Sequence, residues 1–162
     1  MNTEQLSRAE FRAMSKRFMK SGQLDDEMVT IINGNLLTPI ELKSFSLMAR
    51  KKMLVDIPAG DLSRAELNAI YKVTKVRNYY DTKTGRSTTI MLMIITIMIV
   101  ILNAMSTNEM SIPLIIIFST LVIGIVFAVS ISMNRLMIGR LKREFLKAVA
   151  QGYPEIKDDF EF

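Results

Sequence analysis

Two long apolar stretches dominate the pattern of hydrophobic and polar positions along this chain. Residues 87–108 contain no charged side chain and lie between Arg86 and Glu109, and residues 110–134 contain none either and end before Arg135. At about 1.5 Å of rise per residue, each stretch would as a helix exceed a bilayer hydrocarbon core of about 30 Å. Soluble cores rarely contain two apolar runs of this length joined by so short a link. We therefore predict two transmembrane helices that form a hairpin.

Before the first stretch, three segments share the pattern of a helix start. They are Leu6-Ser7-Arg8-Ala9-Glu10-Phe11, Leu37-Thr38-Pro39-Ile40-Glu41-Leu42 and Leu62-Ser63-Arg64-Ala65-Glu66-Leu67. In each, the hydroxyl can accept a hydrogen bond from the backbone N–H three residues later, and the Glu can accept one from the cap N–H. Helices should therefore begin at Arg8, Pro39 and Arg64. Because the segments diverge after this signal, we interpret them as shared capping chemistry and not as a duplication.

The N-terminal part of the chain should form a small helical module. A shorter helix is expected to begin after Asp25 and to stop at Asn33-Gly34, while Ser21-Gly22 and residues 57–60 supply breaks. Apolar residues share one face of three predicted helices, namely Phe11, Met14 and Phe18, then Leu42, Phe45 and Ala49, then Leu67, Ile70 and Val73 or Thr74. This predicted core is thin, so we expect contact with the membrane, the C-terminal helix or a partner to stabilise the module further.

The C-terminal part should continue the second span as an amphipathic helix, which ends at Gly152-Tyr153-Pro154. Its apolar stripe consists of Ile138, Leu141, Phe145 and Val149. Such a helix could lie along lipid headgroups or dock onto the N-terminal module. The acidic tail beyond it is expected to be disordered, although Phe160 and Phe162 could form a short recognition motif.

Charge orients the predicted hairpin. Residues 1–86 carry 15 Lys/Arg against 10 Asp/Glu, residues 135–153 carry five against one, and the link between the spans holds only Glu109. Because positive residues near membrane ends are retained in the cytoplasm, both termini should be cytoplasmic. The residues expected to contact lipid headgroups are Arg77, Lys83, Arg86, Arg135, Arg140, Lys142 and Arg143.

Small and polar residues recur at helical spacing within both spans. Thr89, Thr96 and Asn103 are seven residues apart, whereas Thr120, Gly124, Ala128 and Ser132 recur every four residues. Small residues at such spacing let transmembrane helices approach closely. We predict that these residues form a helix-packing face, which could seal the hairpin or bind another copy or another membrane protein.

The composition argues against several classes of function. The chain has no His and no Cys, so the commonest general base and the usual soft-metal ligands are missing. Neither span holds an ionisable residue of the kind that marks a transport pathway. Asp25, Asp26 and Glu27 sit where a helix N-terminus favours negative charge, which accounts for them without catalysis. We expect no enzyme activity, no cofactor and no metal.

The segment that begins at Leu37-Thr38-Pro39 also fits a DNA-binding helix-turn-helix. A turn and a second helix follow it, with Arg64, Lys72, Lys75 and Arg77. A recognition helix usually reads bases from its N-terminal turns, but most of these basic residues cluster near the predicted membrane. Attraction to anionic headgroups explains that placement more simply, so no nucleic-acid partner is expected.

The sequence thus predicts an all-α membrane protein. It would consist of a cytosolic helical module (1–86), a first transmembrane helix with the start of the external loop (87–108), the loop end with a second transmembrane helix (109–134), a cytosolic amphipathic helix (135–152) and an acidic tail (153–162).

The predicted function is that of a multi-pass inner-membrane adaptor or regulator, without enzyme activity, whose partners are the bilayer, a membrane protein and a further copy. One hypothesis within this class is a superinfection-exclusion, plasmid-exclusion or immunity factor of bacterial, phage or plasmid origin. The alternatives are a holin-like permeabilising protein and a subunit of a secretion or assembly machine.

Overall fold

The described part of the chain is entirely helical. A computed structural model describes the backbone of residues 5–49, 52–106, 112–137 and 139–162, and the side chains of these residues except 103–106, 112–116, 118, 119 and 133–137. Six α-helices and three short 3-10 helices, but no strand, occur in these ranges. The prediction of an all-α fold is confirmed.

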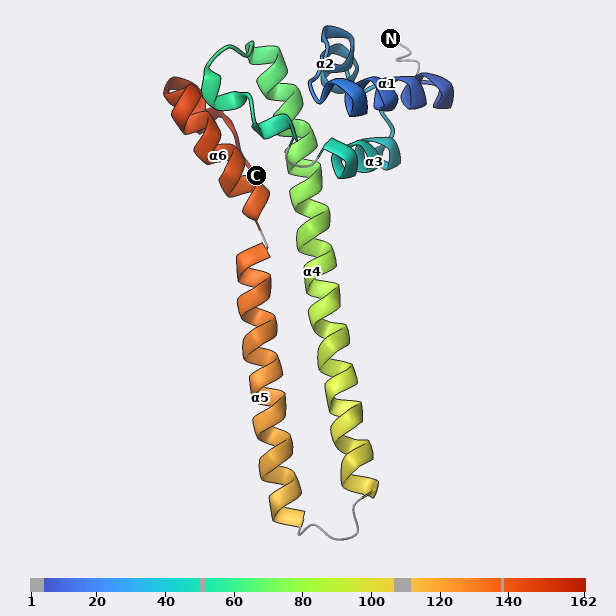
Figure 1. Ribbon diagram of the computed structural model, residues 1–162, viewed down its shortest axis with the longest axis vertical. Coiled ribbons are helices and arrows are strands. Elements are labelled where there is room, and N and C mark those ends of the chain that lie inside the picture. The colour runs from blue at the N-terminus through green and yellow to red at the C-terminus, as the bar shows by residue number, and fades with distance from the viewer. Residues whose placement is uncertain (1–4, 50–51, 107–111, 138) are drawn as a thin grey trace. The chain divides into compact units, whose positions relative to one another are not determined.

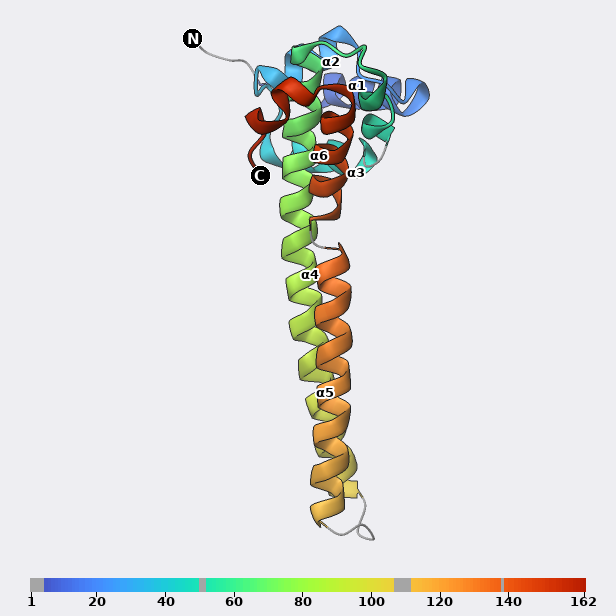
Figure 2. The same ribbon diagram turned by 90° about the vertical axis from the view of Figure 1, so that its left-hand side faces the viewer.

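The helices fall into two compact units, which are described separately. Unit 1 comprises residues 1–80 together with 140–162, and unit 2 comprises residues 81–139. The long helix α4 (Arg64–Ser106) contributes its first turns to unit 1 and the remainder to unit 2. Figures 1 and 2 show α4 as one continuous helix.

Local chemistry sets the helix starts in unit 1 as predicted. The helices are α1 (Arg8–Ser21), α2 (Asp26–Asn33), α3 (Pro39–Ala49) and the first part of α4. In all three capping boxes the hydroxyl accepts from the Glu backbone N–H, at 3.3 Å each, and the Glu carboxylate accepts from the cap N–H. Gly22, with φ of 77°, ends α1 by donating its N–H to the carbonyl of Phe18. These predicted boundaries are confirmed.

The core of unit 1 joins segments far apart in the sequence. Phe18 of α1 and Phe45 of α3 are fully buried, with ring centroids 5.0 Å apart. The same cluster includes Phe145 and Val149 of α6 (Arg140–Gly152). Since α6 packs into this core, its docking on the N-terminal module is the alternative that the structure supports.

Two features of the C-terminal part differ from the prediction. The helix does not continue unbroken from 135, because α5 (Ile112–Met137) ends before Gly139, whose φ of 72° suits the left-handed region, and α6 starts at Arg140. The expectation of a disordered tail is wrong: η3 (Pro154–Asp159) is ordered and Phe160 is buried in the core of unit 1. The tail packs because Phe160 is buried in this core, with Ile156 and Phe162 against it, so these apolar side chains contribute hydrophobic burial that its acidic composition does not reveal.

The 3-10 segments η1 (Lys52–Leu54) and η2 (Ile57–Ala59) pack against α6. The backbone of Gly152 lies so close to η2 that a Cβ atom there would collide with the carbonyl oxygen of Ile57. The Tyr153 hydroxyl bonds both the N–H and the carbonyl of Leu62, which fixes the end of α6 to the start of α4.

In unit 2 the second part of α4 and α5 run side by side in opposite directions (Figures 1 and 2). One helical segment among the described residues, Arg64–Leu102, is long and apolar enough to cross a membrane, and none of its most apolar window is buried. The described apolar segment of α5, Thr120–Ser132, is shorter than a span. A buried core helix would not leave such a window uncovered.

Candidate functional site

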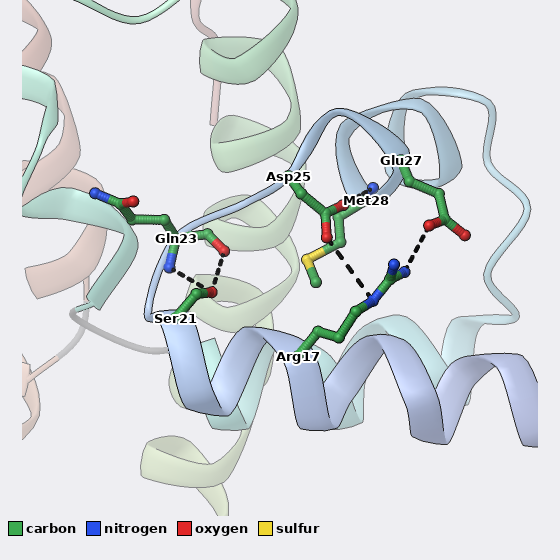
Figure 3. A network of polar contacts seen from close by, with 6 residues as sticks. All are labelled: Arg17, Ser21, Gln23, Asp25, Glu27 and Met28. Carbon is green, nitrogen blue, oxygen red and sulfur yellow. Dashed lines mark hydrogen bonds and ion pairs between the residues drawn. The ribbon is translucent and has the colours of Figure 1, made fainter.

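The acidic cluster at the start of α2 has a structural role. Asp25 accepts the backbone N–H of Met28 at 2.8 Å and so caps the helix, as Figure 3 shows. Arg17 of α1 extends toward this end of α2 and lies 2.7 Å from Glu27 and 3.8 Å from Asp25. The hydrogen bond to Glu27 raises the pKa of the Arg17 guanidinium. The cluster therefore links α1 to α2 through exposed ion pairs. Ion pairs at the protein surface contribute little to stability.

One pocket of 280 Å³ lies in unit 1 between the loop after α1, η2 and the start of α4. Leu24, Met53 and Ile70 line it together with the carboxylates of Asp56, Asp61 and Glu66. Two of these carboxylates already accept hydrogen bonds, Asp56 from Gln23 at 3.4 Å and Glu66 from the Ser63 N–H at 2.6 Å. Among the described residues no group of three potential metal ligands occurs. The pocket provides neither a nucleophile with a base nor a metal cage.

The basic residues considered for DNA binding have partners inside unit 1. Lys72 donates to the carbonyl of Asn33 at 2.8 Å and to the side-chain oxygen of Asn35 at 2.9 Å, which satisfies the end of α2. Arg64 pairs with Asp159 at 2.9 Å, and Lys75 donates to the carbonyl of Glu161 at 2.9 Å. These bonds hold α2 and the C-terminal tail against α4.

The predicted packing face is divided between two sides of unit 2. Thr89 and Thr96 of α4 are half-buried, and their hydroxyls donate to the carbonyls of Gly85 and Leu92 at 3.0 and 2.8 Å. On α5 the four small residues Thr120, Gly124, Ala128 and Ser132 are all exposed, whereas Val122 and Val126 are half-buried and Ser130 is buried. A Cβ at Gly124 would meet no atom within 4 Å. The side chain of Asn103 lies outside the described residues.

The residues predicted to meet lipid headgroups differ in exposure. Lys83, Arg86, Arg140 and Arg143 are exposed, Arg77 and Lys142 are half-buried, and the side chain of Arg135 lies outside the described residues. Arg140 pairs with Glu144 one turn away at 2.7 Å. Lys142 lies over the ring of Phe162, 5.7 Å from its centroid. Contact of these residues with lipid headgroups stays a prediction.

Sequence reasoning missed an aromatic cluster at the junction of α4, α6 and the tail. It consists of Tyr71, Phe145, Phe160 and Phe162, whose ring centroids lie 5.1 to 6.0 Å apart in five pairs. The Tyr71 hydroxyl and the Lys75 ammonium both donate to the carbonyl of Glu161. The alternation Phe160-Glu161-Phe162 is the only local signal, because two residues two apart in an extended segment share one face. The cluster is intramolecular, so it is not the recognition motif considered above.

Comparisons of this chain with protein families, with curated proteins and with solved structures find no match.

Proposed function

We propose that this protein is a membrane-anchored adaptor without enzyme activity, which holds a folded helical unit at the cytoplasmic face of the inner membrane. The observation that carries the proposal is the continuity of α4. The helix leaves the core of unit 1, where Leu67 and Val73 are buried, and continues into an apolar stretch whose most apolar window holds no residue buried by the described part of the chain. Lipid is the natural environment of such a stretch.

A second crossing by α5 completes the proposed anchor. This helix has 26 residues, or about 39 Å at 1.5 Å per residue, and a strongly apolar composition. Two crossings would return the chain to the side from which it started. This agrees with the way residues 1–80 and 140–162 share one core, since segments on opposite sides of a bilayer could not pack together.

The exposed small residues of α5 are the proposed contact with a second membrane protein or a second copy. Close helix approach in lipid favours small residues, and Gly124 offers open space. Within the adaptor class we propose a role in exclusion or immunity, because blocking another membrane process requires binding and no chemistry. A holin-like protein needs little beyond its spans, whereas most of this chain belongs to unit 1. A holin should collapse the membrane potential on expression, while an adaptor should be tolerated.

The topology can be tested by thiol labelling, because the chain has no cysteine. Single variants Glu109→Cys in the link, Lys20→Cys in α1 and Lys157→Cys in η3 would be treated in intact cells with a membrane-impermeant maleimide. We expect labelling at 109 alone, and labelling at 20 and 157 only after permeabilisation. Protection at 109, or recovery of the protein in solution without detergent, would refute the anchor.

The adaptor role can be tested by crosslinking in native membranes followed by recovery of the partner. Gly124→Leu and Ala128→Leu should abolish recovery because they fill the close-approach surface. Val129→Leu is the matched control, since Val129 is 53% exposed but lies off the small-residue face. Equal recovery with all three variants would show that this face does not bind the partner.

A further inference from the structure

Helix α3 has two apolar faces, and among the described residues only one of them is buried. Phe45 and Ala49 are fully buried against the core of unit 1. On the opposite side Ile40 is 77% exposed and Leu47 is 47% exposed, with Lys43 between them. These three residues are three and four positions apart, so they share one helix face. A helix that is apolar on both sides normally has both sides covered.

The contacts along α4 show where in unit 1 this uncovered face lies. Lys72 of α4 bonds the end of α2, whereas Tyr80, two turns further along α4, lies under the Nζ of Lys43 at 4.3 Å from the ring centroid. Helix α3 is therefore further along α4 than α2 is, as both views of unit 1 show (Figures 1 and 2). Tyr80 is also the last residue of α4 that belongs to unit 1.

Tyr80, the α4 residue that Lys43 contacts, is close along the same helix to the start of the apolar stretch. Ser87, the first residue of that stretch, lies seven positions after Tyr80, which corresponds to about 10 Å of helix. The headgroup layer on each side of a bilayer is about 5–8 Å thick. Side chains on α3 can therefore reach that layer if the apolar stretch of α4 is in lipid.

The residue types on this face fit a bilayer surface. Lys43 has an apolar stem and a charged end, which suits an interface between acyl chains and anionic headgroups. The Tyr80 ring lies under Lys43, and its neighbour Tyr79, 61% exposed, has its ring 5.4 Å from that of Tyr80. Tyrosines are enriched at membrane interfaces. The carboxylate of Glu41, the acidic residue of α3, accepts hydrogen bonds from the backbone N–H and the hydroxyl of Thr38. The face therefore presents apolar and positive groups together.

We propose that the exposed face of α3, formed by Ile40, Lys43 and Leu47, lies in the headgroup layer of the cytoplasmic leaflet and binds anionic phospholipid. Unit 1 is then held at two places, by the covalent link through α4 and by this second contact. The contact limits how unit 1 can tilt and so fixes which of its surfaces a cytosolic partner meets. This inference rests on the proposed anchoring of α4 in the bilayer.

The absence of tryptophan from the chain allows a direct test. Single variants Ile40→Trp and Leu47→Trp of the full chain would be reconstituted in vesicles of phosphatidylcholine with a minority of phosphatidylglycerol. The phosphatidylcholine would carry bromine near the headgroup end of its acyl chains, which quenches tryptophan on contact. Val55→Trp is the matched control, because Val55 is 73% exposed and adjoins η2 at the far end of α6. Ile95→Trp, in the apolar stretch of α4, reports on anchoring itself.

We expect the emission of the variants at 40 and 47 to shift to the blue and to lose most of its intensity, while that at 55 stays unquenched. Replacing Lys43 with Glu in the Ile40→Trp background should reduce the quenching in vesicles that contain phosphatidylglycerol. If tryptophan at position 95 is quenched while tryptophan at positions 40 and 47 stays unquenched like that at 55, the inference about α3 is wrong but the proposed membrane anchor is retained. A blue shift without quenching would mean that protein covers the face, which also overturns the inference. Loss of quenching at 95 as well would overturn the proposed function.

Discussion

The contact between the end of α6 and η2 leads to a sharp prediction at Gly152. An added methyl group there would collide with the carbonyl oxygen of Ile57 and would lie 3.3 Å from both the Ile57 carbonyl carbon and the Pro58 Cα. These are backbone atoms, so they cannot turn aside as the end of a side chain could. Gly152→Ala should therefore destabilise unit 1.

The size of the effect follows from two opposing terms. Overpacking of a tight site costs about 1–3 kcal/mol, and a backbone obstacle places this case at the upper end. Alanine is favoured over glycine within a helix by about 1 kcal/mol, which offsets part of the cost. The net loss should be about 2 kcal/mol, or about a 30-fold increase in the population of the open state.

Thiol exchange can measure this change, since the chain has no other cysteine. Ser15→Cys places a reporter in α1, where the hydroxyl is buried without a hydrogen-bond partner, and Ala148→Cys places one in α6, where the side chain is 8% exposed. When closing is faster than labelling, the labelling rate follows the open population. Gly152→Ala should raise the rate at both reporters if unit 1 opens as a whole, and at 148 alone if only α6 detaches.

Gly124→Ala is the control, because it makes the same change in a helix where the new methyl group meets no described atom within 4 Å outside the helix's own neighbouring backbone. Gly124→Ala should leave the labelling rates of the cysteines at positions 15 and 148 unchanged or slightly lower. If Gly152→Ala labels no faster than Gly124→Ala at either reporter, then α6 and η2 are not packed as described and the reasoning is refuted.

Two further predictions concern the tail and the first helix cap. Phe160→Ala should destabilise unit 1 by about 3 kcal/mol, because Phe160 is 7% exposed and packs on Tyr71 and Phe145, whereas Met19→Ala, at a 51% exposed site, should change the same labelling rates little. Hydrogen bonding to Ser7 holds the pKa of Glu10 below its ordinary value of 4.5. The cap therefore stabilises α1 fully above that value and loses this contribution as the pH falls through the folded-state pKa. As the pH falls through the pKa of Glu10, hydrogen exchange of the backbone amide of residue 10 should accelerate more in the unmodified protein than in Glu10→Gln. The same pH profile in both proteins would contradict the assignment of the effect to the Glu10 carboxylate.

Features that depend on neighbours a few residues apart could be predicted from the amino-acid sequence alone. The helix starts at Arg8, Pro39 and Arg64 follow from capping boxes that span three residues. The buried faces of α1, α3 and α4 follow from helical periodicity, and the uncovered apolar stretch of α4 follows from composition. Each of these depends on local geometry, so one sequence suffices.

The contacts between segments far apart in the chain became visible only in the folded structure. Gly139 could have continued a helix, but its left-handed backbone lies between α5 and α6, and α6 packs into the core of unit 1. The tail has the composition of a disordered segment, yet Phe160 and Phe162 find Tyr71, which lies about ninety residues earlier in the chain. Burial of these rings depends on a cavity built by other helices, and no pattern within the tail can reveal that cavity.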